Sequence, residues 1–339
     1  MNNIFNYKLS DLEDYFVALG EKKFKARQIY DWLYKKQVYD FKDMTNIKKD
    51  LIDKLAEDFN TDMIKIVKKQ EDKTASKYLF KLFDDNYIEA VLMYHDYGIS
   101  VCVSSQVGCN MGCKFCESGR LKKVRNLETY EMVEQILLIE QDIKQRISSV
   151  VIMGIGEPFD NYNNVLNFIK IINSDLGIAI GARHITVSTC GLIPKIKEFS
   201  NENIQVNLAV SLHAPNNDLR NKIMPINKAY PLKDLIVTLK EYIKKTNRRV
   251  TIEYVILDKV NDSRENALEL ANLLKGMNVY VNLIPYNETN NLDFKKSDRS
   301  NILKFYDTLK KQKINVTIRK EFGANIDGAC GQLRSKEVD

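Results

Sequence analysis

Three cysteines stand within eight residues of this chain, in the segment VGCNMGCKFCESG. Cys109, Cys113 and Cys116 follow the spacing Cys-x3-Cys-x2-Cys, and Gly108 and Gly112 allow the backbone to wrap closely around a bound group. Three soft thiolates at this spacing can bind three irons of a 4Fe-4S cluster, and the fourth iron then stays open to a chelating ligand. The pattern therefore predicts an iron–sulfur centre.

A structural zinc site is the alternative interpretation of the same cysteines. Zinc usually has four protein ligands, often arranged as two separated pairs. A zinc site here would have to recruit Cys190, Cys330 or a histidine as its fourth ligand. A non-catalytic zinc module that binds RNA is therefore a second hypothesis. We interpret Cys190 itself as a structural residue, and His95 and His184 as ordinary polar residues.

The composition is that of an ordinary globular protein, with 44% hydrophobic and 28% charged residues in a chain of 339. A net charge of +6 permits a polyanionic partner without requiring one. The first residues contain no apolar signal-peptide core, and no run of about 18 apolar residues could span a bilayer. Six cysteines over this length, three of them clustered, fit a reducing compartment. We therefore expect a cytoplasmic monomer with no membrane contact.

Three segments with different sequence patterns divide the chain. Residues 1–62 predict short helices, and we interpret them as an RNA-binding accessory domain. The helix expected over 22–36 carries several basic residues around Trp32, a pattern suited to RNA binding. A helix with a solvated basic face and an apolar stripe packed on the core explains the pattern equally well. Residues 63–94 have short apolar runs on both sides of a turn and predict a small β linker element. Residues 95–335 repeat a strand and then a helix.

This repeat favours an α/β fold with a parallel sheet and right-handed crossovers, either an open sheet or a β/α barrel. In both architectures the chemistry lies at the carboxyl ends of the strands. The uncommon motifs follow the expected strands, so we expect all of them on one face. The expected strands are 99–104, 149–154, 184–188, 206–212, 250–256, 279–284 and 316–319. Examples of the expected helices are 129–143, 162–172, 232–244 and 263–274. The motifs are the cysteine cluster and residues 154–158, 188–191, 211–213, 285–287 and 328–331.

A Cys-x3-Cys-x2-Cys motif after the first strand of a β/α fold resembles the radical S-adenosylmethionine (SAM) superfamily, in which SAM occupies the fourth iron. Further segments along nearly the whole chain resemble the RlmN family, whose members methylate C2 of adenine in 23S rRNA and in tRNA. The resemblance implies a radical SAM partial β/α barrel with a small N-terminal helical accessory domain. The segments that carry it are 28–34 (QIYDWLY), 104–109 (SSQVGC), 151–158 (VIMGIGEP), 184–189 (HITVST), 224–227 (MPIN) and 329–333 (ACGQL).

The resemblance also implies a reaction. The targets are C2 of adenine 2503 in 23S rRNA and C2 of adenine 37 in tRNAs. The C2–H bond of adenine is not acidic enough for simple deprotonation, so a radical route through cofactors is chemically reasonable. One SAM methylates Cys330, and a second SAM on the cluster is cleaved to a 5′-deoxyadenosyl radical that activates this methyl group. An electron donor such as flavodoxin or ferredoxin supplies the electron. The related Cfr type, which methylates C8 of the same rRNA adenine and confers antibiotic resistance, is the closest alternative.

Two further residues acquire roles through the resemblance. Cys102 matches the thiol that forms a disulfide with Cys330 to release the product, and Glu89 matches the proton acceptor. From the residues alone, Cys102 is a lone strand cysteine, a type that is more often inert, and most glutamates placed like Glu89 are solvated.

The remaining matches concern SAM itself. Gly156 and Glu157 match contacts to the SAM amino group, for which a glycine gives close backbone approach and a carboxylate gives a partner charge. Without the resemblance, polar residues at strand ends usually only cap helices or form hydrogen bonds within loops. The other SAM contacts that the resemblance implies are Ser188, Ser211, Leu212, His213 and Asn287.

One residue departs from the family pattern. Glu117 follows the third cysteine, where the family usually has a small residue. A carboxylate beside an anionic cluster is unfavourable unless a cation pairs with it. We therefore expect Arg120 or Lys122 to pair with Glu117.

Overall fold

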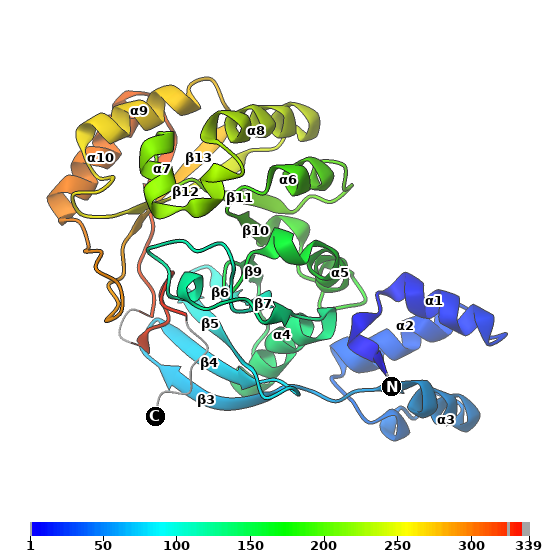
Figure 1. Cartoon of the computed structure of the whole chain (residues 1–339). Coiled ribbons are helices and arrows are strands. Elements are labelled where there is room, and N and C mark those ends of the chain that lie inside the picture. The colour runs from blue at the N-terminus through cyan, green and yellow to red at the C-terminus, as the bar shows by residue number, and fades with distance from the viewer. Residues whose placement is uncertain (1, 324–325, 334–339) are drawn as a thin grey trace.

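A ten-stranded sheet is the centre of the protein, which is described by a computed structural model that covers residues 2–323 and 326–333 (Figure 1). Seven strands of this sheet in the described residues run parallel, and their order follows the chain. They are β6 (Gly98–Cys102), β9 (Ser149–Ile152), β10 (Ile185–Thr189), β11 (Asn207–Ser211), β12 (Val250–Ile256), β13 (Val279–Pro285) and β14 (Val316–Ile318). The expected repeat is confirmed, with strand ends displaced by at most two residues.

Helices follow the parallel strands and lie along the outer side of the curved sheet (Figure 1). α8, for example, buries an apolar stripe against it with Leu235, Leu239 and Tyr242, which recur at the spacing of a helical face. The arrangement confirms the radical SAM type of partial β/α barrel. The helices are α4 (Thr129–Ile143), α5 (Tyr162–Asn173), α6 (Ile193–Phe199), α7 (Asn217–Ile223), α8 (Leu232–Thr246), α9 (Arg264–Leu274) and α10 (Arg299–Lys311).

Three antiparallel strands extend the sheet beyond β6: β5 (Tyr87–His95), β4 (Ala75–Lys81) and β3 (Lys65–Glu71). Val91 of β5 pairs with Cys102 of β6, and both pack in one apolar cluster with Met93. Residues 65–95 thus continue the barrel sheet, and the division of the chain at 62/63 and 94/95 remains a prediction. Residue 1 and the predicted boundary at 335 lie outside the described residues.

The N-terminal segment forms α1 (Leu9–Ala18), α2 (Phe24–Tyr30) and α3 (Lys49–Asp58). The helix expected over 22–36 begins at Phe24 and changes to a π-helical turn at Asp31–Lys35. These helices share one continuous apolar core with the barrel.

Buried Glu134 of α4 joins the N-terminal segment to the barrel. It accepts hydrogen bonds from the Asn3 side chain (3.2 Å) and from the backbone N–H of Ile64 (2.9 Å). Burial raises the pKa of this carboxyl group well above its usual value. These bonds fix the accessory helices against the outer side of the barrel.

Short elements complete the secondary structure. Two-residue strands pair as β1 (Asn2–Asn3) with β2 (Phe59–Asn60) and as β7 (Gln106–Val107) with β8 (Arg125–Asn126). The 3₁₀ turns are Ile4–Asn6, Phe41–Asp43, Glu117–Arg120, Pro158–Asn161, Ala182–His184 and Pro225–Lys228. Among the helices of the described part of the chain, none is both long enough and apolar enough to cross a bilayer.

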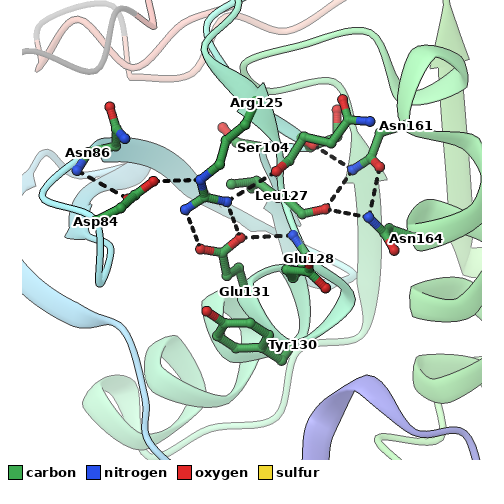
Figure 2. Close-up of polar contacts among 12 residues, drawn as sticks. Asp84, Asn86, Ser104, Arg125, Leu127, Glu128, Tyr130, Glu131, Asn161 and Asn164 are labelled. Atoms are coloured by element: carbon green, nitrogen blue, oxygen red, sulfur yellow. Dashed lines mark hydrogen bonds and ion pairs between the residues drawn. The ribbon is translucent and has the colours of Figure 1, made fainter. Parts of the chain in front are cut away.

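Arg125 in β8 holds the segment that follows the cysteine cluster (Figure 2). Its guanidinium donates two 2.7 Å hydrogen bonds to the carboxylate of Glu131, in the first turn of α4, and one of 2.6 Å to Asp84. Glu131 also accepts from the backbone N–H of Glu128 and so caps the helix. The Glu131 side chain is 1% exposed, so its charge depends on this arginine.

Replacing Arg125 should therefore destabilise the fold. We expect Arg125→Met to lower the free energy of unfolding by about 3 kcal/mol, because it leaves a buried carboxylate unpaired. Lys195→Met is the matched control, because its ion pair with Glu198 is exposed and such pairs contribute little. Chemical denaturation measures both, and equal stability losses would contradict this account of Arg125.

Candidate active site

The three clustered cysteines lie on a loop that follows β6 and β7, at the carboxyl end of the parallel strands. The loop folds tightly on itself: the Cys109 N–H donates to the carbonyl of Leu121 (3.1 Å), and the Cys116 N–H to that of Cys113 (3.2 Å). Gly108 has φ of +73°, and a Cβ there would lie 2.2 Å from the Lys122 carbonyl oxygen. Only glycine fits this position.

The thiols of Cys109, Cys113 and Cys116 line one cavity, which we call the cluster-loop cavity. Burial raises the pKa of Cys109 to about 12 and also raises the pKa values of the other two thiols. Neutral thiols at this depth become ligands only when a metal centre supplies positive charge.

The spacing of these cysteines is compatible with a multi-iron centre. Within the described residues, no three His, Cys, Asp or Glu side chains are placed to hold one metal ion. A cubane makes a different demand, since each cysteine binds a different iron and the sulfur atoms need not converge on one point. The alternative of a structural zinc site is therefore not supported by the arrangement of these side chains.

Glu157 lies in the cluster-loop cavity with its carboxylate held by backbone donors. It accepts from the N–H of Cys190 (2.7 Å) and from the N–H of Phe159 (3.0 Å), and it is 3% exposed. Burial raises the pKa of this carboxyl group. Gly156 beside it has φ of +109°, and a Cβ there would overlap Gln106. Glu157 thus supplies the cavity with a desolvated carboxylate, which suits an ammonium ligand.

Three more of the expected SAM residues, Ser188, Ser211 and His213, line the same cavity from the ends of β10 and β11. Burial lowers the pKa of His213 to about 3, so the ring is neutral. Its Nδ1 accepts from the Val255 N–H (3.0 Å), which leaves the hydrogen on Nε2. Leu212 is buried and is not among the residues that line this cavity.

A second cavity adjoins the first, and we call it the Cys102 cavity. Cys102 and Cys330 both line it, as does Asn287, while Cys116 and Cys330 line both cavities. Cys102 lies on the inner side of β6, and burial raises the pKa of its thiol to about 12. The structure therefore brings the two thiols of the expected transfer chemistry next to the cluster loop. All six cysteines of the chain are free thiols.

Glu89 is buried on β5, at 3% exposure, rather than solvated. Its carboxylate pairs with the ammonium of Lys77 on β4 (3.2 Å), and both side chains are at most 5% exposed. Lys77 also donates to the carbonyl of Asp327, three residues before Cys330 (3.4 Å). Glu89 is thus tied to the segment that carries Cys330.

Glu117 has the partner that its position requires. Arg120 lies 3.6 Å from its carboxylate, which confirms one of the two expected cations, and Asn291 donates to the same oxygen (3.3 Å). The other carboxylate oxygen is buried and accepts no hydrogen bond from the described residues. The Glu117 backbone N–H donates to the carbonyl of Gly331 (2.8 Å), so the cluster loop and the Cys330 segment are joined.

Three residues near the site escaped the sequence analysis: Lys77, Arg220 and Arg319. Arg319 lines both cavities, and one nitrogen of its guanidinium is buried with no hydrogen-bond partner in the described part of the chain. Single basic residues in strands and helices carry no motif. Only the pairing of distant segments reveals what they face.

Two family models match the chain. The Ribosomal RNA large subunit methyltransferase N-terminal domain matches residues 2–60, and the Radical SAM superfamily matches residues 103–271. A solved radical SAM methyltransferase from Sphaerobacter thermophilus is 40% identical, with a TM-score of 0.93 over 99% of this chain and 100% of that chain.

Curated relatives match over almost the full length. A protein of Spiroplasma citri named "Probable dual-specificity RNA methyltransferase RlmN" is 54% identical over 99% of this chain and 98% of its own. A relative with the same name from Enterococcus faecalis is 54% identical over 99% of this chain and 97% of its own. The fold, the cysteine loop and these similarities agree: the chain belongs to the RlmN family of radical SAM RNA methyltransferases.

Proposed function

We propose that the protein methylates C2 of adenine 2503 in 23S rRNA and C2 of adenine 37 in tRNAs, through a methylated Cys330. One observation carries the proposal: Cys102 and Cys330 line one cavity, and Cys330 also lines the neighbouring cavity that contains the three cluster cysteines. A methyl-carrying thiol needs both a radical source and a second thiol within reach, and this arrangement offers both. The dual-specificity names of the relatives support two RNA substrates.

The cofactors follow from the family, which uses SAM and a 4Fe-4S cluster. Cys109, Cys113 and Cys116 would hold three irons, and Gly156 and Glu157 would receive the SAM amino group. Ser188, Ser211, Leu212, His213 and Asn287 would complete the SAM contacts. When bound, the cluster and SAM supply the electron and the radical that activate the methyl group.

Cys330 first acts as the nucleophile. Its sulfur takes the methyl group of one SAM, so that a sulfur–carbon bond forms while the methyl–sulfonium bond breaks. The activated carbon on Cys330 then bonds to C2 of adenine, and the residue holds the RNA covalently. Two SAM molecules are used in each turnover, one for the methyl group and one for the radical.

Release of the product requires a base and a second thiol. Glu89 takes the proton from C2, from a buried position that the ion pair with Lys77 holds. Cys102 then loses its thiol proton and forms a disulfide with Cys330, while the bond between Cys330 and the transferred carbon breaks. That carbon takes up a proton to complete the methyl group, and the unpaired electron left by the radical addition would return to the cluster. A cytoplasmic reductant restores both thiols. We further propose a monomer that receives its electron from a flavodoxin or ferredoxin.

Loss of a cluster ligand should abolish metal binding. We expect Cys109→Ser, Cys113→Ser and Cys116→Ser to lose iron, sulfide and the absorbance near about 400 nm after anaerobic reconstitution. Cys190→Ser is the control and should keep the cluster, because Cys190 is expected to be structural. A colourless wild-type protein that retains zinc would overturn the proposal.

The product identifies the position of methylation. We expect nucleoside mass spectrometry of 23S rRNA and tRNA treated with the reconstituted enzyme to show 2-methyladenosine. Cys330→Ala should give no methylated nucleoside, because it lacks the methyl carrier. Detection of 8-methyladenosine alone would instead assign the Cfr-type activity.

Removal of the second thiol should trap the covalent intermediate. We expect Cys102→Ala to accumulate a protein–RNA crosslink through Cys330, because no disulfide can form to release the product. Denaturing gels with labelled RNA measure the crosslink, and the double variant with Cys330→Ala should not form it. If Cys102→Ala turns over without a crosslink, Cys102 is not the resolving thiol.

A further inference from the structure

Arg220 of α7 is completely buried, at 0% exposure, beneath the cluster-loop cavity. Its guanidinium donates to the carbonyl of Leu212 (3.2 Å), to that of Cys190 (2.7 Å) and to that of Ser211 (3.3 Å). A fourth bond goes to the side-chain oxygen of Asn227 (2.9 Å). All four acceptors are neutral.

No carboxylate forms an ion pair with Arg220 anywhere in residues 2–323 and 326–333. The Asn227 amide that accepts from it donates onward to the side-chain oxygens of Asn217 and Asn221, so the network ends in neutral groups. A buried cation without a nearby anion costs free energy, and burial accordingly lowers the pKa of Arg220. Its hydrogen bonds are satisfied, but its charge is not balanced.

A negative charge that balances Arg220 would lie at the loop that carries the three cluster cysteines. Cys190 and Ser211, which bond to Arg220 through their carbonyls, line the cavity that contains the three cluster thiols. Arg220 therefore lies directly behind residues that form the wall of this cavity.

The other charged groups near the cavity do not replace Arg220. His213 is neutral, because burial lowers its pKa to about 3. Arg319 is only partly buried, and it lines the Cys102 cavity as well, together with Cys102 and Cys330. Glu157 is held by backbone N–H groups, one of them from Cys190, and forms no ion pair with Arg220 in the described residues.

We propose that the Arg220 guanidinium is the buried counter-charge of the iron–sulfur cluster and raises its reduction potential. The proposal rests on the cluster assigned above. A cluster bound by three thiolates is anionic and gains another negative charge on reduction, so a fixed cation stabilises the reduced form more than the oxidised form. Net charge and surroundings are among the factors that set such potentials. Arg220 is thus a positioning and tuning residue that touches no substrate.

A redox titration of reconstituted variants tests this role. We expect Arg220→Gln to lower the equilibrium constant for one-electron reduction about tenfold, which is a shift of about 59 mV to more negative potential. Arg220→Lys keeps the charge and should stay close to wild type. Electron paramagnetic resonance of the reduced cluster provides the readout, independent of methyl transfer. Equal shifts in both variants, or none in either, would overturn the proposal.

A second pair of variants covers the case in which Arg220→Gln does not fold. Asn227→Asp and Asn227→Ala both remove the amide that donates to Asn217 and Asn221, but only aspartate places a negative charge on the guanidinium. We expect a negative shift in Asn227→Asp relative to Asn227→Ala, and equal potentials would contradict the proposal. A wild-type protein without a cluster would instead contradict the proposed function, so the two failures are distinguishable.

Discussion

The hydrogen-bond register of the parallel strands is the constraint on which the site depends. Cys102 of β6 pairs with Val151 of β9 on one side and with Val91 of β5 on the other. Because side chains alternate between the two faces of a strand, a slip of one residue would move Cys102 from the cavity to the helix-covered side. The same register lines up the carboxyl end of β6, which precedes the cluster loop, with those of β9 to β13, which precede the residues proposed to bind SAM. Register therefore decides both the edge and the face on which the reactive groups gather.

Burial sets the second requirement, since a buried charge is stable only when something compensates it. Glu89 meets this requirement through Lys77, and Glu131 through Arg125. Glu157 relies on backbone N–H groups, which satisfy its oxygens and leave the charge available to a cationic ligand. Glu89 and Glu131 therefore already have a cationic partner, whereas Glu157 has none among the described residues.

Much of this architecture follows from local sequence signals. The period of apolar residues located the parallel strands, and α4 has the expected bounds of 129–143. Glu117 could be recognised as a residue that needs a cation because it departs from the family pattern beside the cysteine cluster, and its partner Arg120 is only three positions away. In contrast, Lys77 meets Glu89 only across paired strands, and no local pattern reveals that contact.

Two further features were out of reach for two different physical reasons. The acceptors of Arg220 come from the ends of β10 and β11, so its burial depends on the packing of α7 against them. The π-helical turn at Asp31–Lys35 shares the apolar period of the helix before it, and periodicity over so few residues does not separate the two forms.

The join between the cluster loop and the Cys330 segment holds two distant cysteine motifs close together, as the proposed transfer requires. Glu117 binds Gly331 through the backbone, and the Ser118 hydroxyl donates to the carbonyl of Leu333 (2.7 Å). These bonds flank Cys116 on one segment and Cys330 on the other. Transfer between a radical source and a thiol-bound methyl group demands a fixed, short separation, because misplacement by about 1 Å can cost a hundredfold in rate. The bond from the Glu117 backbone does not depend on the side chain at this position, which lets this chain carry a glutamate at 117.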